Sequence, residues 1–74
     1  MTTGEKIREL RKAQGLTQEE LAQKIGVTES TISMYETGKR EPDLETLVRI
    51  ADVLDVSTDY LLGRSASPSS IDAQ

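Results

Sequence analysis

The sequence contains no cysteine and no histidine, and these absences exclude several kinds of chemistry. Without cysteine there are no disulfides, thiolate nucleophiles or cysteine-ligated zinc sites. Without histidine, the commonest general base and metal ligand near neutral pH is missing. The sequence also has no glycine-rich phosphate loop and no metal-ligand spacing. We therefore expect that the chain is not an enzyme and that it binds no metal or other cofactor.

Aromatic residues and long apolar segments are scarce as well. Tyr35 and Tyr60 are the only aromatic residues, whereas proteins that bind single strands stack successive bases on aromatic side chains. No segment approaches the roughly 20 apolar residues that span a bilayer, and residues 1–12 lack the apolar core of a signal peptide. We expect a cytoplasmic protein, at the bacterial nucleoid, with no membrane partner.

The net charge of −4 is, at first sight, unfavourable for binding nucleic acid. The charges are unevenly distributed, however. Residues 1–40 contain seven basic and six acidic side chains, a net of 7 − 6 = +1, while residues 41–74 contain two and seven, a net of 2 − 7 = −5. Any binding to DNA by the first part should therefore be modest in affinity and strongly dependent on salt.

The 74 residues are enough for one domain with a small core. Apolar spacings of three and four, together with capping residues, predict five helices. The first covers residues 3–14 and the second begins at Thr17, which forms a capping box with Glu20. The third covers residues 28–37, the fourth is capped by Asp43 and runs to Leu54, and the short fifth follows Ser57 and contains residues 60–62. No alternating pattern predicts a strand. The predicted domain spans residues 1–63, and residues 64–74 have the composition of a disordered tail or linker.

Between residues 17 and 37 the sequence predicts two helices joined by a tight turn. Leu21 and Ile25 share one helical face by their spacing of four, and Ile32 and Tyr35 share another by their spacing of three. Gly26 can adopt a positive φ at little cost, which ends the first of these helices sharply.

Two further residues fit this pair of helices. Ala22 is small enough to let the second helix approach closely, and Thr28 is suited to cap its first turn. Two helices joined by a turn that contains glycine form the helix-turn-helix unit, which presents its second helix to the major groove of DNA. The unit, at about residues 18–37, therefore predicts binding to double-stranded DNA.

Residues 5–63 closely resemble the phage-repressor/Cro-type helix-turn-helix family, also called XRE. The resemblance is carried by GLTQEELAQKIGV at 15–27, ISMYETGKREP at 32–42, Leu47, Ile50, Ala51, Leu54, and VSTDYLLG at 56–63. It implies an all-α, compact five-helix lambda-repressor-like domain that binds operator DNA as a dimer and regulates transcription.

The resemblance also implies roles for individual residues at the DNA. The outward side of the third helix faces base edges, where Glu29 could accept from a cytosine amine or merely stabilise the helix dipole. Met34 could contact a thymine methyl group or pack beside Tyr35. The base-contacting candidates are Glu29, Ser30, Ser33 and Met34, and the phosphate-contacting candidates are Gln18, Thr28, Lys39 and Arg40.

Other residues are expected to support the binding unit from within. By the resemblance, Arg11 bonds Glu36 and so orients the third helix, although Arg11 could instead reach a phosphate directly. Ala22 and Gly26 shape the turn. Residues of the fifth helix are candidates for a dimer contact or for burial in the monomer core; they are Tyr60, Leu61 and Leu62.

The sequence therefore predicts a transcriptional regulator of bacterial or phage type, a repressor that acts by occupying its operator. Two weakly associating copies would bind an approximate inverted repeat, because one small domain discriminates poorly between sequences. A second possibility is an antitoxin-like module that neutralises a partner protein. The acidic second half and the serine-rich end of the chain favour it.

Overall fold

The computed structural model describes residues 1–64, and within them the chain forms five helices and no strand. They are α1 (Thr3–Ala13), α2 (Gln18–Ile25), α3 (Glu29–Thr37), α4 (Leu44–Leu54) and α5 (Thr58–Leu61). The all-α prediction is confirmed for this part of the chain. The predicted tail, residues 64–74, lies outside the described residues except for Arg64.

Short-range capping defines where most helices begin. Thr17 accepts a hydrogen bond from the backbone N–H of Glu20, whose carboxylate accepts one from Thr17 in return, as the predicted capping box requires. Asp43 and Ser57 cap α4 and α5 as predicted. Thr2 forms a second capping box with Glu5 at the start of α1, which the sequence analysis did not predict.

Two helix ends differ from the prediction. Helix α1 ends at Ala13 rather than residue 14, because Gln14 has left the helical conformation as the C-cap. Helix α5 ends at Leu61, so Leu62 is its C-cap and not part of it. Helix α4 ends at Leu54 as predicted, and its C-cap Asp55 has a φ of 59°, the left-handed conformation usually taken by glycine.

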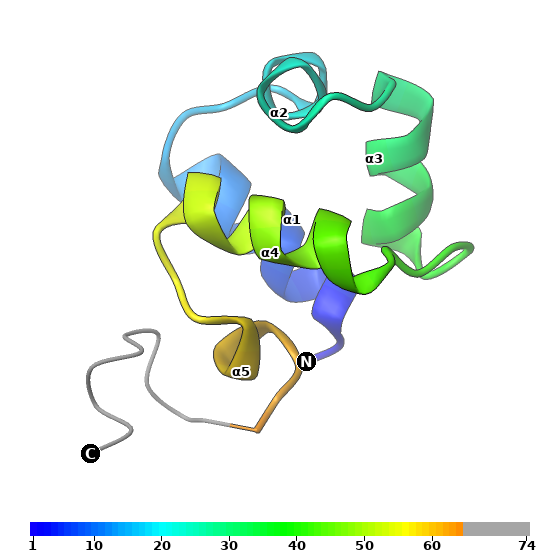
Figure 1. Cartoon of the computed structure of the whole chain (residues 1–74). Coiled ribbons are helices and arrows are strands. Elements are labelled where there is room, and N and C mark those ends of the chain that lie inside the picture. The colour runs from blue at the N-terminus through cyan, green and yellow to red at the C-terminus, as the bar shows by residue number, and fades with distance from the viewer. Residues whose placement is uncertain (65–74) are drawn as a thin grey trace.

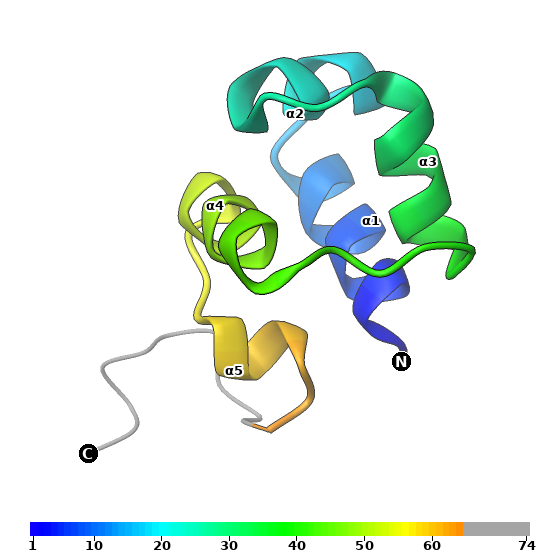
Figure 2. The same cartoon turned by 45° about the vertical axis from the view of Figure 1, so that its right-hand side comes forward.

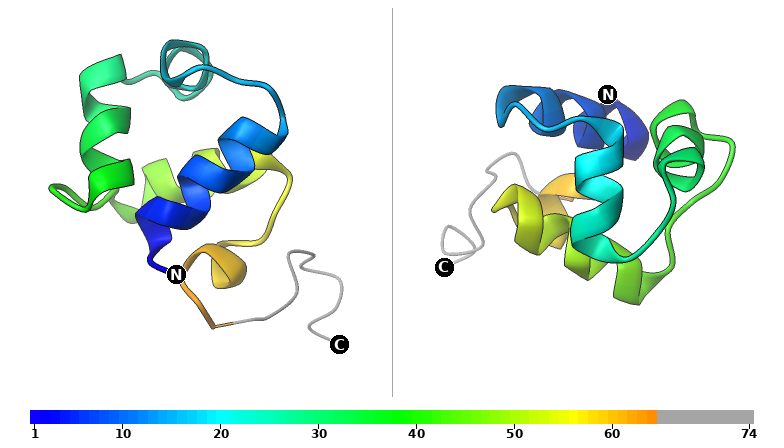
Figure 3. Two further views of the ribbon diagram at one scale, coloured as in Figure 1. Left: turned by 180° about the vertical axis from the view of Figure 1, so that it is seen from behind. Right: turned by 90° about the horizontal axis from the view of Figure 1, so that it is seen from above.

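The helices surround one core. Helix α1 lies beside α3 and α4, α2 packs on α3 and α4, and α5 covers the end of α1 and α4 near the N-terminus (Figures 1 and 2). Seen from above, α2 crosses between α1 and α4 (Figure 3). Every helix contributes to the buried apolar set, which consists of Ile7, Leu21, Ala22, Ile25, Ile32, Tyr35, Leu47, Ile50, Ala51, Leu54 and Leu61. Within residues 1–64, no helix is long and apolar enough to cross a bilayer.

Candidate nucleic-acid interface

The turn between α2 and α3 has the geometry that the sequence predicts. Gly26 has a φ of 81°, and its backbone N–H donates to the carbonyl oxygen of Ala22 at 2.9 Å. The backbone N–H of Val27 donates to the same oxygen at 3.0 Å. These bonds end α2 and redirect the chain, so that α3 crosses α2 steeply (Figure 1). Ala22 is buried in the core, where a larger side chain would have to displace its neighbours.

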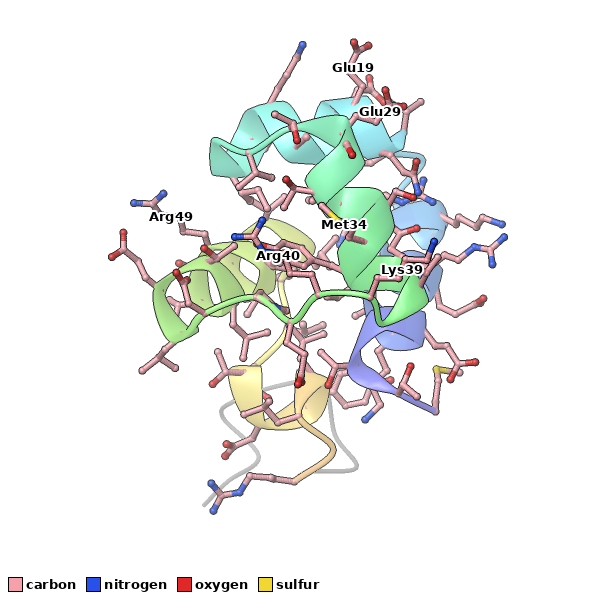
Figure 4. All side chains as sticks on the ribbon, turned by 90° about the vertical axis from the view of Figure 1, so that its right-hand side faces the viewer. Glu19, Glu29, Met34, Lys39, Arg40 and Arg49 are labelled. Atoms are coloured by element: carbon pink, nitrogen blue, oxygen red, sulfur yellow. The ribbon has the colours of Figure 1, made fainter. Side chains whose placement is uncertain are left out.

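Helix α3 separates a buried face from an accessible one. Ile32 and Tyr35 are buried, while the remaining side chains of the first two turns are wholly or partly exposed. Figure 4 looks onto this accessible side, where Glu29 lies at the start of α3 and Met34 faces outward. The four base-contacting candidates thus lie on the solvent side of α3, with Glu29 and Ser30 exposed and Ser33 and Met34 half-buried.

Thr28 is the N-cap of α3, as predicted. Its hydroxyl oxygen accepts from the backbone N–H of Thr31 at 3.1 Å and lies 2.9 Å from the hydroxyl of that residue. Thr28 is nevertheless exposed. Capping and contact with a phosphate are therefore compatible, and the contact stays a prediction.

The predicted bond between Arg11 and Glu36 is present and buried. The Nε of Arg11 donates to one carboxylate oxygen of Glu36 at 2.6 Å, and its Nη2 donates to the other at 3.2 Å. A third donor of Arg11, Nη1, is bonded to the carbonyl oxygen of Leu16 at 2.8 Å. Arg11 thus joins α1 to α3 and to the segment before α2. These bonds account for Arg11 without a phosphate.

Gln18 belongs to the same network. Its side-chain Nε2 donates to Glu36 at 3.1 Å, so the start of α2 is bonded to the last turn of α3. This bond is not predicted from the sequence, where Gln18 is only a phosphate-contacting candidate. Its amide carries a second N–H, and the backbone N–H groups of Gln18 and Glu19 have no partner within the helix, so a contact with phosphate remains a prediction.

Lys39 and Arg40 follow α3 in a tightly held loop. Gly38 adopts a φ of 79°, and the backbone N–H groups of Lys39 and Arg40 donate to the carbonyl oxygen of Met34 at 2.9 and 3.3 Å. Both side chains are exposed and extend from the lower end of α3 (Figure 4). The backbone therefore fixes where the two cations leave α3, while their side chains stay available.

The electrostatics of this face are mixed. Glu19 and Glu29 lie in the first turns of α2 and α3, where a negative charge complements the helix dipole (Figure 4). Glu20 is also in the first turn of α2, and the backbone N–H of Thr17 and then the Thr17 side chain lower the pKa of its carboxyl group. These charges make the face less attractive to an anion such as phosphate.

The three candidates for a dimer contact have different surroundings. Leu61 is fully buried in the monomer core, which is the second of the two predicted alternatives, and it is not available at the surface. Leu62 is 48% exposed and Tyr60 is half-buried. The side chain of Lys6 holds this region against α1, because Nζ donates to the carbonyl oxygen of Tyr60 at 2.8 Å and lies 5.0 Å from the centre of its ring.

Two residues near this face were missed by sequence reasoning. Gly4 in α1 is buried against the end of α3, and only its helical position three residues before Ile7 could have indicated it. Arg49 on α4 lies on the same side of the molecule as Arg40 (Figure 4) and forms an exposed ion pair with Glu45 at 2.7 Å.

Comparison with known proteins identifies the arrangement. A family model described as "Helix-turn-helix" matches residues 7–61. The chain belongs to this helix-turn-helix family. One relative, the uncharacterized HTH-type transcriptional regulator YqaE of Bacillus subtilis (strain 168), is 48% identical over 58 residues, which cover 78% of this chain and 50% of the relative.

Solved structures of family members share the fold. The P22 c2 repressor in complex with a synthetic operator is 35% identical with a TM-score of 0.84, and the match covers 88% of this chain and 98% of that one. SinR, in its complex with SinI, is 37% identical with a TM-score of 0.77, and the match covers 82% of this chain and 60% of that one. The chain spans about half the length of the first curated relatives that it matches.

Proposed function

We propose that this helix-turn-helix domain binds double-stranded DNA sequence-specifically and belongs to a transcriptional repressor that occupies its operator. Helix α3 enters the major groove, where Glu29, Ser30, Ser33 and Met34 contact base edges. In this proposal the protein is cytoplasmic, acts at the nucleoid and has no catalytic activity.

One observation carries the proposal. The accessible face of α3 has groups suited to phosphate beside it: Gln18 at the start of α2, which is bonded to Glu36 of α3, and the loop with Lys39 and Arg40 that directly follows α3. Helix N-termini and basic side chains are the usual phosphate ligands, and such contacts fix the position of a recognition helix on the duplex. The P22 c2 repressor, which shares the fold at a TM-score of 0.84, was solved in complex with an operator, and this supports the same use of the face.

Two copies would bind one operator. A single domain with short polar side chains at the bases discriminates poorly, so two recognition helices in successive grooves are needed for useful specificity. The half-sites of an approximate inverted repeat would then be centred about 10–10.5 base pairs apart. Leu62 and Tyr60 are the accessible residues for the subunit contact, and the small patch favours assembly on DNA over a stable dimer in solution.

The test begins with selection of duplexes that the protein binds from a random library, followed by fluorescence anisotropy over a range of salt concentrations. We expect an enriched inverted repeat and a negative slope of log affinity against log salt, about −0.9 per phosphate neutralised. Lys39→Ala and Arg40→Ala should each make this slope less steep and weaken binding to selected and random duplexes alike.

Arg64→Ala is the matched control, because it removes the same charge beyond α5. It should leave both the slope and the affinity near the wild-type values. Absence of any enriched sequence, or an affinity independent of salt, would contradict the proposal.

A protein partner is the second candidate function. Leu44 is 73% exposed and Val48, one turn further along α4, is 41% exposed. The solved complex of SinR with SinI shows that a family member of similar fold was captured with another protein. This candidate would be favoured if Leu44→Ser together with Val48→Ser abolished repression in cells while DNA binding in vitro was unchanged.

A further inference from the structure

The first turn of α1 makes an unusually close contact with the end of α3. Gly4 is buried, and a Cβ atom built on it would overlap the carbonyl oxygen of Tyr35 and lie 2.8 Å from that of Glu36. Separations under 3.0 Å are essentially never observed for a real Cβ atom, and both obstacles are backbone atoms rather than flexible side-chain ends. Glycine is therefore the residue that permits the present distance between α1 and α3.

The contact lies where α3 passes into the loop that contains Lys39 and Arg40. The carbonyl oxygen of Tyr35, which a side chain at position 4 would displace, also accepts the backbone N–H of Gly38 at 3.3 Å. Lys39 and Arg40 follow directly. Gly4, Gly38 and Arg40 line the same surface cavity, so they are close in space as well. A displacement at Gly4 would thus reach the phosphate-contacting candidates and not only the buried side of α3.

Gly4 also shares one face of α1 with the other residue that holds α3. Gly4, Ile7 and Arg11, spaced by three and four, are the buried residues of α1. Gly4 contacts the backbone of Glu36, and Arg11 binds its carboxylate. The last turn of α3 is therefore fixed by its main chain at one point and by a side chain at another.

From this geometry we infer that Gly4 is a positioning residue for DNA recognition. It sets the distance between α1 and the end of α3 at which the base-contacting face of α3 and the Lys39–Arg40 loop fit one duplex together. The inference rests on the proposed function. A side chain at position 4 moves the loop relative to the start of α3, so the two sets of contacts no longer form at once. Phosphate contacts alone, which suffice for random DNA, are less affected.

The test compares wild-type protein and Gly4→Ala on the duplex selected by the wild type and on a random duplex. Gly4→Ala should lower affinity for the selected duplex by about tenfold or more, which is the cost of one mismatched base pair, while affinity for random DNA changes by less than about threefold. A purely structural role would lower both affinities in proportion to the unfolded fraction and leave their ratio unchanged.

Ile50→Val is the control for stability, because it removes one methylene from the core in α4 and leaves both partners of the α1–α3 contact intact. Its ratio of the two affinities should equal that of the wild type. If Gly4→Ala is partly unfolded, all three proteins are measured in the same concentration of trimethylamine N-oxide, which favours the compact state.

Two results would overturn the inference: an unchanged ratio for Gly4→Ala, or the same change of ratio in Ile50→Val. Failure of the wild type to prefer any duplex would instead overturn the proposed function, so the two failures are distinguishable.

Discussion

Replacing Glu36 by alanine would leave the Arg11 guanidinium buried without its anionic partner. Both residues are only 8% exposed, and removal of one partner of a buried ion pair costs about 3–5 kcal/mol. Arg11 keeps its bond to the carbonyl oxygen of Leu16, so we expect the lower end, about 3 kcal/mol. At roughly 0.05–0.15 kcal/mol per residue, 74 residues have a total stability of only about 4–11 kcal/mol.

The measurement is urea unfolding followed by far-UV circular dichroism, with a thermal scan beside it. A loss of about 3 kcal/mol corresponds to a fall in Tm of about 12–24 °C in a domain of this size. Glu45→Ala is the surface control, because it breaks the exposed ion pair with Arg49 and should cost less than about 0.5 kcal/mol.

The double variant Arg11→Met with Glu36→Leu distinguishes the contribution of the ion pair from the contribution of the volume that the two side chains fill. Replacing both charges by apolar side chains of similar volume is often neutral, so this variant should regain most of the lost stability. Neither Glu36→Ala nor the double variant keeps the bond from Gln18, so both should bind DNA more weakly than the wild type. A Glu36→Ala protein as stable as the Glu45→Ala control would refute the reasoning.

Four further predictions concern the turn between α2 and α3, the recognition of bases, the dependence of Tm on pH, and the acidic charge near the contacting face. Gly26→Ala should cost about 1–2 kcal/mol by urea unfolding, because the φ of 81° is strained for any side chain although a Cβ atom would meet nothing within 4 Å; the same Tm as the wild type would contradict this. Ser33→Ala and Glu29→Gln should change the sequences enriched by selection but leave Tm nearly unaltered, since both lie on the solvent side of α3. Tm should fall as the pH is lowered below about 5, because backbone N–H donors at helix starts depress the pKa of Glu5 and Glu20 below 4.5, and bonds from the Thr46 side chain and then its backbone depress the pKa of Asp43 below 3.8. Each carboxylate stabilises the fold above its unfolded-state pKa, and this stabilisation is lost as the pH falls through its folded-state pKa. Glu20→Gln should therefore make the fall in Tm with pH less steep. Glu19→Gln should raise affinity for random and selected duplexes alike at low salt, whereas Asp59→Asn, the same charge change in α5, should not.

The sequence predicted the elements whose chemistry is local. Thr17 and Glu20 satisfy each other across three residues, and Gly26 ends α2 by its own backbone conformation, so neither depends on the rest of the fold. The accessible side of α3 followed from the spacing of Ile32 and Tyr35 in the same way. These features locate the candidate interface.

The features that the sequence could not predict depend on contacts between distant residues, or on a residue other than glycine in the left-handed conformation. Gly4 is required by the backbone of α3, more than thirty residues away in the chain, and its spacing of three from Ile7 indicates a buried position but not this close contact. The bond from Gln18 to Glu36 exists only once α2 and α3 are packed. Asp55 adopts the left-handed conformation that glycine adopts at the ends of α2 and α3, since aspartate is among the few other residues that tolerate it.

The net charge of −4 does not by itself decide whether this domain attracts DNA. Screening limits each exposed charge to a range of about 8–10 Å, so phosphates respond to the charges of the contacting face. Part of the acidity has a structural use in α4, where Asp43 is the N-cap and Asp55 is the C-cap. On the face itself, Glu19 and Glu29 form no ion pair among residues 1–64, and they stabilise the starts of α2 and α3 through the helix dipole. The charges that stabilise the two helices of the binding unit therefore also weaken its attraction to phosphates. In the proposed function, affinity then depends more on base contacts and on the exact placement of α3, which we assign to Gly4 and the Arg11–Glu36 pair.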